Sequence, residues 1–357
     1  MVGHSGIGTQ VSSILGVLTR KKTVDLTLLG DSGKLTEHLP GFQGKVIPWT
    51  APIYSLAEQL RPPPIPDGHI AHFPHYSAPI LRVNRGVVCV HDLIHLQSPE
   101  FKLHHRLYAL FMLQGVLRRA RRIVTVSDTT RAELIKRFPF AAGRTVTIHN
   151  GLDHKRYRKP TASTLGKFRS RYGLPKDYLL TVGIGKQHKN IDFVMRALLP
   201  LWRDGKLKTP LVMGGTGGEL PPYVRAVIEP GYDRTLEEFV HLLPYIDESE
   251  MPALYGGARL LIYPSLLEGF GFPMVEAMAC GTPVLSSDRA SLPEVGGDAA
   301  VYFNPEDQKE FIERLTGLLK APARLKKLAA AGLKRSKEFD WESHVDALIE
   351  TYRKILL

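Results

Sequence analysis

The chain has 357 residues, of which 43% are hydrophobic and 23% are charged, and its formal net charge is +12. This composition excludes intrinsic disorder, and the length exceeds what one hydrophobic core usually fills, so two domains are expected. No apolar run reaches the ~18–20 residues that cross a bilayer. Residues 1–15 lack the pattern of a secretory signal, and the 2 cysteines exclude a disulfide framework. These features favour a cytoplasmic protein.

The positive charge is concentrated in the N-terminal part of the chain. Residues 1–165 contain 22 Lys and Arg against 10 Asp and Glu, whereas the rest of the chain contains 25 of each kind. Eleven of the 14 histidines also lie in residues 1–165. A nucleic acid, an anionic membrane or a phosphate-bearing substrate would each suit such a surface.

Short β-branched runs alternate with helical patterns along most of the chain. Strands are expected at 24–29, 86–90, 122–126, 145–148, 178–182, 210–213, 260–263, 283–285 and 300–302. Helices are expected at 9–18, 101–119, 128–137, 191–201, 273–279, 305–319 and 341–355. This alternation predicts an α/β fold with parallel sheets. The wholly apolar run 86–90 suits a sheet that is covered on both faces.

The alternation pauses at 149–176, a polar and basic stretch that contains prolines and a glycine. A domain boundary is therefore expected near residue 165. The N-terminal domain would span 1–165 and the C-terminal domain 166–335, which leaves 336–357 as a C-terminal helix. Cys89 and Cys280 stand among apolar residues and are expected to be buried.

Residues 264–284, PSLLEGFGFPMVEAMACGTPV, carry the most informative pattern. They follow the apolar run 260–263. Gly269 and Gly271 allow a tight backbone path, and Pro273 suits the first position of a helix. A helix is therefore expected to begin there, at the carboxyl end of a strand, where free N–H groups and the helix dipole attract a diphosphate.

Two glutamates flank this expected helix start. Glu268 lies in the preceding loop, and Glu276 lies about one turn inside the helix. One carboxylate could face a sugar while the other reaches a ribose. The plainer alternative is that Glu276 only faces solvent.

The segment resembles the E-x7-E signature of glycosyltransferase family 4, a family of retaining enzymes. Their GT-B fold has two Rossmann-like domains that face each other across a cleft. Other segments resemble the same family in the same order, so the resemblance spans nearly the whole chain. They are the glycine loop 4–9, the strand ends 72–76 and 90–95, the interdomain segments 126–127 and 149–153, and the loop 182–190.

The resemblance implies roles for residues of the C-terminal domain. Glu268 would contact the donor sugar hydroxyls, Glu276 would bind the ribose diol, and Lys189 would neutralise the leaving diphosphate. The other implied donor-binding residues are Gly183, Lys186, Tyr245, Ile246, Phe270, Gly271 and Phe272. No cofactor and no metal are implied, because lysine and helix N-termini would take the electrostatic role of a metal.

In the N-terminal domain the resemblance implies that Gly6 and Gly8 let the glycine loop approach the phosphate. His91 would lie near the reacting sugar, so that His91, Glu268 and Lys189 are the expected catalytic residues. The helix 341–355 would return from the C-terminal domain to pack on the N-terminal one.

Two positions depart from the family pattern. Ile184 stands where the family often has arginine, and Lys186 would supply the second positive charge. A Rossmann glycine loop follows a strand, yet only residues 1–3 precede this one. We therefore expect the first strand to be missing from the numbered sequence.

Other motifs have plainer explanations. The glycine-rich run 214–218 lacks the Gly-Lys-Ser/Thr ending of a triphosphate loop and is expected to be a turn. A zinc site usually recruits cysteine, which is absent near the histidines, so no metal site is expected. These histidines are His72, His75, His91, His95, His104 and His105. The arginines Arg118, Arg119, Arg121 and Arg122 would be a solvated helix end or a membrane contact.

The sequence therefore predicts a metal-independent retaining glycosyltransferase of cell-surface polysaccharide synthesis. GDP-mannose is the favoured donor, because 188–190 is similar to mannosyl- and rhamnosyl-transferring members, and a UDP- or dTDP-sugar is the alternative. The acceptor would be a glycan or lipid-linked molecule, with peripheral contact to an anionic inner membrane through the basic, apolar helix 101–122.

Two other kinds of protein are alternatives. A nucleic-acid-binding protein is suggested by the sequence pI of about 9.6, but it would leave residues 268–281 unexplained. A GT-B phosphorylase would need a pyridoxal lysine site, and the sequence contains no recognisable one. No nucleic-acid partner is therefore expected.

Overall fold

The computed structural model describes residues 6–33, 35, 42–52, 55–215, 217–228 and 233–356. The chain forms two compact units, an N-terminal unit of residues 1–151 with 339–357 and a C-terminal unit of residues 152–338. All strand pairs described in both units are parallel, which confirms the predicted α/β class.

The N-terminal unit contains a four-stranded sheet in the order β3-β4-β5-β6 and a separate pair, β1-β2. Its core packs around β4, which is buried along its whole length as the apolar run predicted. The strands are β1 (Thr27–Gly30), β2 (Lys45–Pro48), β3 (Ala71–Phe73), β4 (Gly86–Val90), β5 (Arg122–Thr125) and β6 (Thr145–Thr147).

The start of one helix in this unit is set by a capping side chain. The Ser127 side chain accepts a hydrogen bond from the Thr130 N–H and so caps the start of the helix at 128–137. The helices are α1 (Gly6–Lys21), α3 (Leu56–Leu60), α4 (Ile94–Gln97), α5 (Leu103–Arg119), α6 (Asp128–Arg137) and α16 (Trp341–Leu356), with 3-10 turns η1 (Val83–Arg85) and η2 (Pro139–Arg144).

The helix expected at 341–355 is α16, and it belongs to the N-terminal unit, where it packs against α1. Its apolar face is buried, including Trp341, Val345 and Leu348. The Lys21 ammonium lies 2.6 Å from an Asp346 carboxylate oxygen across the two helices. Because this pair is partly exposed, the buried face supplies most of the stabilisation.

The C-terminal unit has one six-stranded sheet in the order β12-β11-β10-β7-β8-β9. This is the doubly wound Rossmann order, and the direction of winding reverses between β7 and β10. The strands are β7 (Leu179–Val182), β8 (Leu211–Gly214), β9 (Val240–Leu242), β10 (Leu260–Tyr263), β11 (Val284–Ser287) and β12 (Ala300–Phe303).

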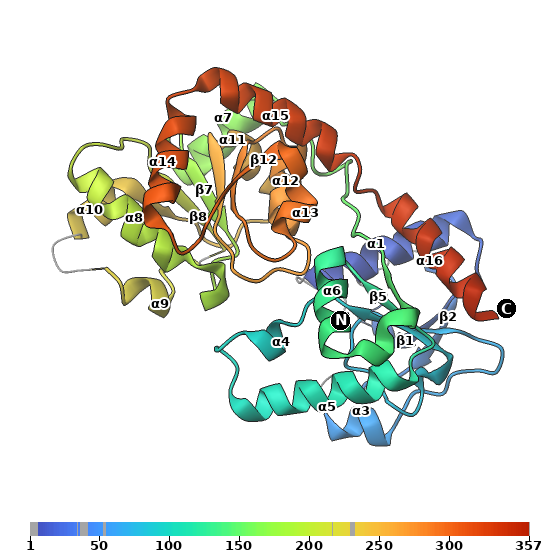
Figure 1. The fold of residues 1–357 in the computed structure, drawn as a ribbon. Helices are drawn as coiled ribbons and strands as arrows, with labels where there is room; N and C mark the ends of the chain where they lie inside the picture. Colours follow the sequence, from blue (N-terminus) through green and yellow to red (C-terminus); the bar gives the residue numbers. More distant parts are fainter. Residues whose placement is uncertain are drawn as a thin grey trace. The chain divides into compact units, whose positions relative to one another are not determined.

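Helices lie on both faces of this sheet (Figure 1). Helices α9, α10 and α14 each pack against α8, whereas α7, α11, α12 and α15 pack in succession. The helices are α7 (Ala162–Tyr172), α8 (Ile191–Arg203), α9 (Pro222–Arg225), α10 (Asp233–Phe239), α11 (Met251–Gly257), α12 (Phe272–Ala279), α13 (Leu292–Gly296), α14 (Gln308–Leu319) and α15 (Pro322–Ser336), with 3-10 turns η3 (Gln187–Lys189) and η4 (Gly297–Ala299).

The polar stretch at 149–176 is not a pause in the fold, because it contains helix α7. This helix buries little besides Phe168, so its surface composition resembles that of a linker. It belongs to the C-terminal unit, and the division between the units falls after residue 151 rather than near residue 165.

The structure adds strands at 45–48, 71–73 and 240–242 and a helix at 322–336, none of which the sequence pattern revealed. Cys89 and Cys280 are free and buried, as predicted. The residues ahead of Gly6 lie outside the described part, and with them the expected missing strand. None of the described helices is both long enough and apolar enough to cross a bilayer.

Candidate functional site

The carboxyl ends of β7 and β10 carry most of the residues that the sequence singled out. The loop after β7 contains Gly183, Lys186 and Lys189, and the loop after β10 contains Glu268. These strands are neighbours at the point where the sheet changes winding direction. Open α/β sheets bind ligands at this place, because the loops there diverge and leave a crevice.

Helix α12 begins at the position that the glycines predicted. Gly271 precedes it with φ at +95°, and a Cβ there would lie 2.7 Å from Leu292 Cδ2. The conformation and the space therefore both require glycine. Pro273 occupies the second helical position rather than the first. It removes no hydrogen bond there, since the first four N–H groups of a helix have no partner within it.

Glu268 is held by a strand residue and a loop residue at once. The Lys189 ammonium and the Tyr263 hydroxyl each donate to Glu268 Oε1 over 2.6 Å. Tyr263 is the last residue of β10, so its position is fixed by the sheet. The Glu268 and Lys189 side chains are only 11% and 18% exposed. Sequence positions far apart thus meet in one hydrogen-bonded cluster.

The cluster sets the protonation state of Glu268. Burial alone would raise the pKa of its carboxyl group, but the Lys189 charge and the hydrogen bonds lower it more. The pKa of Glu268 therefore lies below its usual value. Burial beside this carboxylate raises the pKa of Tyr263 well above its usual value, so the hydroxyl stays protonated and donates.

Glu276 does not simply face solvent, contrary to the plainer alternative. The Tyr255 hydroxyl of α11 donates to Glu276 Oε2 over 2.6 Å. Burial raises the pKa of Glu276, and the Tyr255 and Tyr157 hydroxyls oppose this rise without cancelling it. The charge of Glu248 raises the pKa further, and the charge of Arg156 lowers it.

The remaining donor residues expected in this unit differ in exposure. Ile246 is 7% exposed, whereas Tyr245 is 64% exposed. Gly183 has φ at +71°, and its N–H donates to the Gly214 carbonyl at the end of β8. Lys186 is exposed at the start of η3. The loop after β7 thus places an exposed lysine close to the glycine turn.

Phe270 and Phe272 flank the glycine at the start of α12. Their rings meet edge to face with centroids 5.3 Å apart. Phe270 is 3% exposed. The aromatic pair therefore braces the loop that precedes α12.

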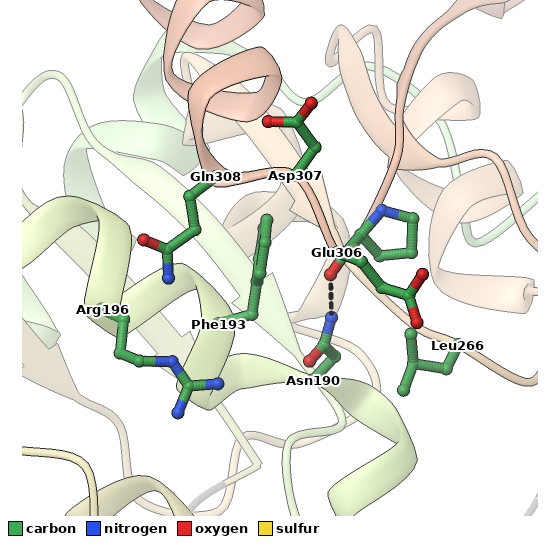
Figure 2. A pocket seen from close by; sticks show the side chains of 8 residues that line it. Asn190, Phe193, Arg196, Leu266, Glu306, Asp307 and Gln308 are labelled. Carbon is green, nitrogen blue, oxygen red and sulfur yellow. Dashed lines mark hydrogen bonds between the residues drawn. The ribbon is translucent and has the colours of Figure 1, made fainter.

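A hollow of about 750 Å³ opens next to this loop (Figure 2). Its lining includes Asn190, which follows Lys189 in the chain, and Leu266, which lies two residues before Glu268. The Asn190 side chain donates a hydrogen bond to the Pro305 carbonyl. Glu306, Asp307 and Arg196 also line it, so its formal charge is −1, which does not favour a diphosphate. The hollow contains none of the expected donor residues, and the candidate site consists of the glutamate and lysine loops.

In the N-terminal unit, Gly6 and Gly8 form the first turn of α1, and His91 follows directly after β4. The His91 Nε2 atom lies 2.8 Å from the Pro74 carbonyl oxygen, which places the ring proton on Nε2. Its ring stacks on His75 with centroids 6.4 Å apart. Burial lowers the pKa of His91, so a neutral imidazole ends this strand.

The sequence did not reveal Tyr255 and Tyr263. Tyr263 was part of the predicted strand, and Tyr255 stood outside every expected element. Aromatic residues at the end of a buried strand are common core residues, so spacing alone could not distinguish a carboxylate partner. Only the fold brings their hydroxyls to the two glutamates.

Comparisons with known protein families match most of each unit to a glycosyltransferase family. Residues 167–335 match the family described as glycosyl transferases group 1, and residues 16–156 match glycosyltransferase family 4. The O-antigen chain mannosyltransferase B of Escherichia coli is 32% identical over 286 residues, which cover 80% of this chain and 74% of that protein.

Further relatives differ in length or in sequence. The serotype-specific mannosyltransferase WbdA of Escherichia coli is 28% identical over 286 residues, and the match covers 78% of this chain but only 35% of WbdA. Among solved structures, HepE of Anabaena in complex with UDP-glucose superposes with a TM-score of 0.75 and 18% identity, covering 99% of this chain and 97% of HepE.

Proposed function

This chain belongs to the group 1 glycosyltransferases of glycosyltransferase family 4, and from that premise we propose that it transfers mannose from GDP-mannose. The acceptor we propose is a glycan or lipid-linked molecule of cell-surface polysaccharide synthesis. Two relatives that are O-antigen or serotype-specific mannosyltransferases support this choice. A UDP-sugar is the alternative donor, because the similar protein HepE was solved in complex with UDP-glucose.

The observation that carries the proposal is the cluster of Glu268, Lys189 and Tyr263 at the switch point of the Rossmann sheet. Glu268 would accept hydrogen bonds from donor sugar hydroxyls, and Glu276 would accept them from the ribose diol. The first N–H groups of α12, near Phe270 to Phe272, would meet the diphosphate. Gly183, Lys186, Tyr245 and Ile246 would complete the nucleotide side.

Lys189 links the sugar side to the leaving group. Its ammonium is bonded to Glu268 in this structure, and a bound diphosphate would share it. With Lys186 and the α12 N-terminus it would offset the charge that develops as the bond from C1 to the phosphate oxygen breaks. We propose that no metal ion is needed for this step. We propose that Gly6 and Gly8 of the N-terminal unit approach the phosphate and that His91 of the same unit lies near the reacting sugar.

We also propose that the new bond keeps the anomeric configuration of the donor, as the E-x7-E pattern implies. The acceptor oxygen bonds to C1 on the face from which the nucleoside diphosphate departs. NMR of the first product measures this directly, because the one-bond coupling between C1 and its proton differs between α and β anomers. A product of inverted configuration would contradict the assignment.

A donor panel tests the proposed function. Melting temperatures would be measured with GDP-mannose, UDP-glucose, ADP-glucose and dTDP-rhamnose, since a ligand that binds only the folded state raises the apparent stability. GDP-mannose should give the largest increase, and should release GDP when acceptor is added, with or without EDTA. A larger shift with UDP-glucose would favour the alternative donor. Binding to DNA that collapses between 50 and 200 mM salt, without any sugar-nucleotide shift, would favour the nucleic-acid alternative.

A membrane-bound acceptor agrees with the surface of α5. Leu103, Leu107 and Phe111 lie one helical turn apart and are 69%, 56% and 66% exposed. Arg118 and Arg119 end the same helix, and Arg121 is exposed just beyond it. Apolar side chains beside arginines suit the interface of an anionic bilayer. We propose peripheral contact of this helix with the inner face of the membrane.

Vesicle sedimentation tests this contact. Replacing Arg118, Arg119 and Arg121 by glutamine should weaken binding to anionic vesicles by about 1 kcal/mol per charge. Replacing Leu103, Leu107 and Phe111 by serine should weaken binding to both anionic and neutral vesicles. Unchanged sedimentation of both variants would identify α5 as a solvated surface.

A further inference from the structure

Each glutamate of the candidate donor site accepts a hydrogen bond from a tyrosine that is almost fully buried. Tyr263 and Tyr255 are both 1% exposed, and each hydroxyl lies 2.6 Å from a carboxylate oxygen, of Glu268 and Glu276 respectively. The family resemblance implies no role for either tyrosine. Two equivalent contacts at two functional carboxylates need an explanation beyond packing.

Both tyrosines come from packed elements of the C-terminal unit, and each holds a flexible glutamate side chain. Tyr263 ends the buried central strand β10, and Tyr255 lies in α11, which packs against both α7 and α12. A glutamate side chain has several rotatable bonds, and ordering it upon ligand binding costs conformational entropy. A hydrogen bond from a fixed donor removes that cost before the ligand arrives.

The Glu268 contact is reinforced by a second donor on the same oxygen. Lys189 Nζ also bonds to Oε1, and it lies 5.9 Å from the centroid of the Tyr263 ring. Tyr263, Lys189 and Glu268 thus form a closed cluster. With Lys189 as its only partner, the Glu268 carboxylate could move together with the flexible lysine side chain. The hydrogen bond from Tyr263, a strand residue, fixes the position of both.

We propose that Tyr263 and Tyr255 are positioning residues of the transferase. Tyr263 orients the carboxylate that reads the donor sugar, and Tyr255 orients the carboxylate that reads the ribose. This inference rests on the proposed function of Glu268 and Glu276. Because the two tyrosines serve different parts of the donor, removing their hydroxyls should affect different steps.

Tyr263→Phe and Tyr255→Phe keep the buried rings and remove only the donors. Tyr178→Phe is the control, since Tyr178 is buried in the same unit and its hydroxyl donates to the backbone carbonyl of Leu254 rather than to a carboxylate. Melting temperature, nucleoside-diphosphate affinity, and kcat and KM for the donor would be measured for all three variants against the unmodified protein.

We expect Tyr263→Phe to lower kcat roughly 10- to 100-fold with little change in GDP affinity, the size typical of a lost hydrogen bond to a charged group. Tyr255→Phe should instead weaken GDP binding by a similar factor. Both hydrogen bonds lower the pKa of their carboxyl groups. The acid limb of kcat/KM should therefore move to higher pH in Tyr263→Phe, and not in Tyr178→Phe.

The outcomes distinguish a failure of the positioning role from a failure of the proposed function. If all three variants lose only melting temperature and keep one common pH profile and kinetic pattern, the tyrosines are packing residues and the inference is wrong. If the unmodified protein releases GDP or UDP from no sugar nucleotide, the proposed function fails, and the inference fails with it. Transfer by the unmodified protein with the crossed pattern in the variants would support both.

Discussion

Glu268 and Glu276 belong to one loop and helix, yet their surroundings shift their pKa values in opposite directions. A neighbouring ammonium stabilises the ionised form of Glu268. Glu276 is partly buried, and the effect of its burial outweighs the hydrogen bonds from Tyr255 and Tyr157, so its ionised form is disfavoured. A ligand that donates hydrogen bonds to Glu276 would favour ionisation, and its binding should therefore weaken as the pH falls.

Replacing Glu276 by alanine should weaken nucleoside-diphosphate binding by ~1.5–3 kcal/mol, because the ribose diol loses a charged acceptor. Isothermal titration at pH 7.5 measures the change. Glu313→Ala, on the exposed side of α14, is the control and should bind as the unmodified protein does. Equal affinities for both variants would remove Glu276 from the donor site.

Gly271 is a second residue whose chemistry can be tested alone. Alanine at this position would combine a disfavoured positive φ with a Cβ 2.7 Å from Leu292, so Gly271→Ala should destabilise the protein by about 2–3 kcal/mol. Gly317→Ala lies in open space within α14 and should stabilise it by ~0.5–1 kcal/mol. Urea unfolding measures both, and effects of equal sign would contradict the described start of α12.

At the scale of elements, sequence patterns located the strands and helices with strong periodicity. The apolar runs 86–90 and 260–263 became β4 and β10 with the predicted ends, and 128–137 became α6. The missed strands have only three or four residues, too few to show a period. Helix α7 was missed because it buries so little that its polar sequence resembles a linker.

The junction between β6 and α16 offers a test of element packing. A Cβ on Gly151 would lie 2.4 Å from the Trp341 backbone nitrogen, so only glycine lets the two segments meet. Gly151→Ala should displace the start of α16 and lower stability by about 1–3 kcal/mol. Gly143, exposed in η2 with nothing near its Cβ position, provides the control. Proteolysis of the C-terminal helix should accelerate in the first variant alone.

At the scale of the whole molecule, the N-terminal unit contains several buried or partly buried histidines whose pKa values burial lowers. Burial lowers the pKa of His72 to about 4, of His75 to about 3 and of His344 to about 4. The His72 Nδ1 atom lies 2.5 Å from the Tyr352 hydroxyl, and the His344 Nδ1 atom lies 2.7 Å from the His149 carbonyl oxygen. These rings are neutral in the folded chain and join α16 to the rest of the unit.

Acidification should therefore destabilise the fold. The unfolded chain binds protons at these histidines near pH 6.5 and the folded chain only near pH 4, so stability is lost as the pH falls between those values. The slope is about 1.4 kcal/mol per pH unit for each histidine. Melting curves from pH 7 to 5 measure it. His72→Asn should flatten the slope, exposed His104→Asn should not, and a slope unchanged in both would contradict the account.

The molecule as a whole was predictable to the level of its α/β class and its family, because the ordered motifs lie in loops that follow buried strands. The partners of the catalytic candidates were not predictable. Two of these partners, Lys189 and Tyr255, are distant in sequence from the carboxylates that they contact. The third, Tyr263, is near Glu268 in sequence, but its spacing from Glu268 is not distinctive. Their roles depend on the order of strands in the sheet, which a one-dimensional pattern does not contain.

We propose above all that Glu268, held by Lys189 and Tyr263, acts on the donor sugar rather than on the nucleotide. The most direct measurement compares donor turnover and nucleoside-diphosphate affinity for Glu268→Ala and the unmodified protein under one set of conditions. The account predicts that turnover falls about 100-fold or more, while the affinity stays within a few-fold. Turnover equal to that of the unmodified protein would contradict it.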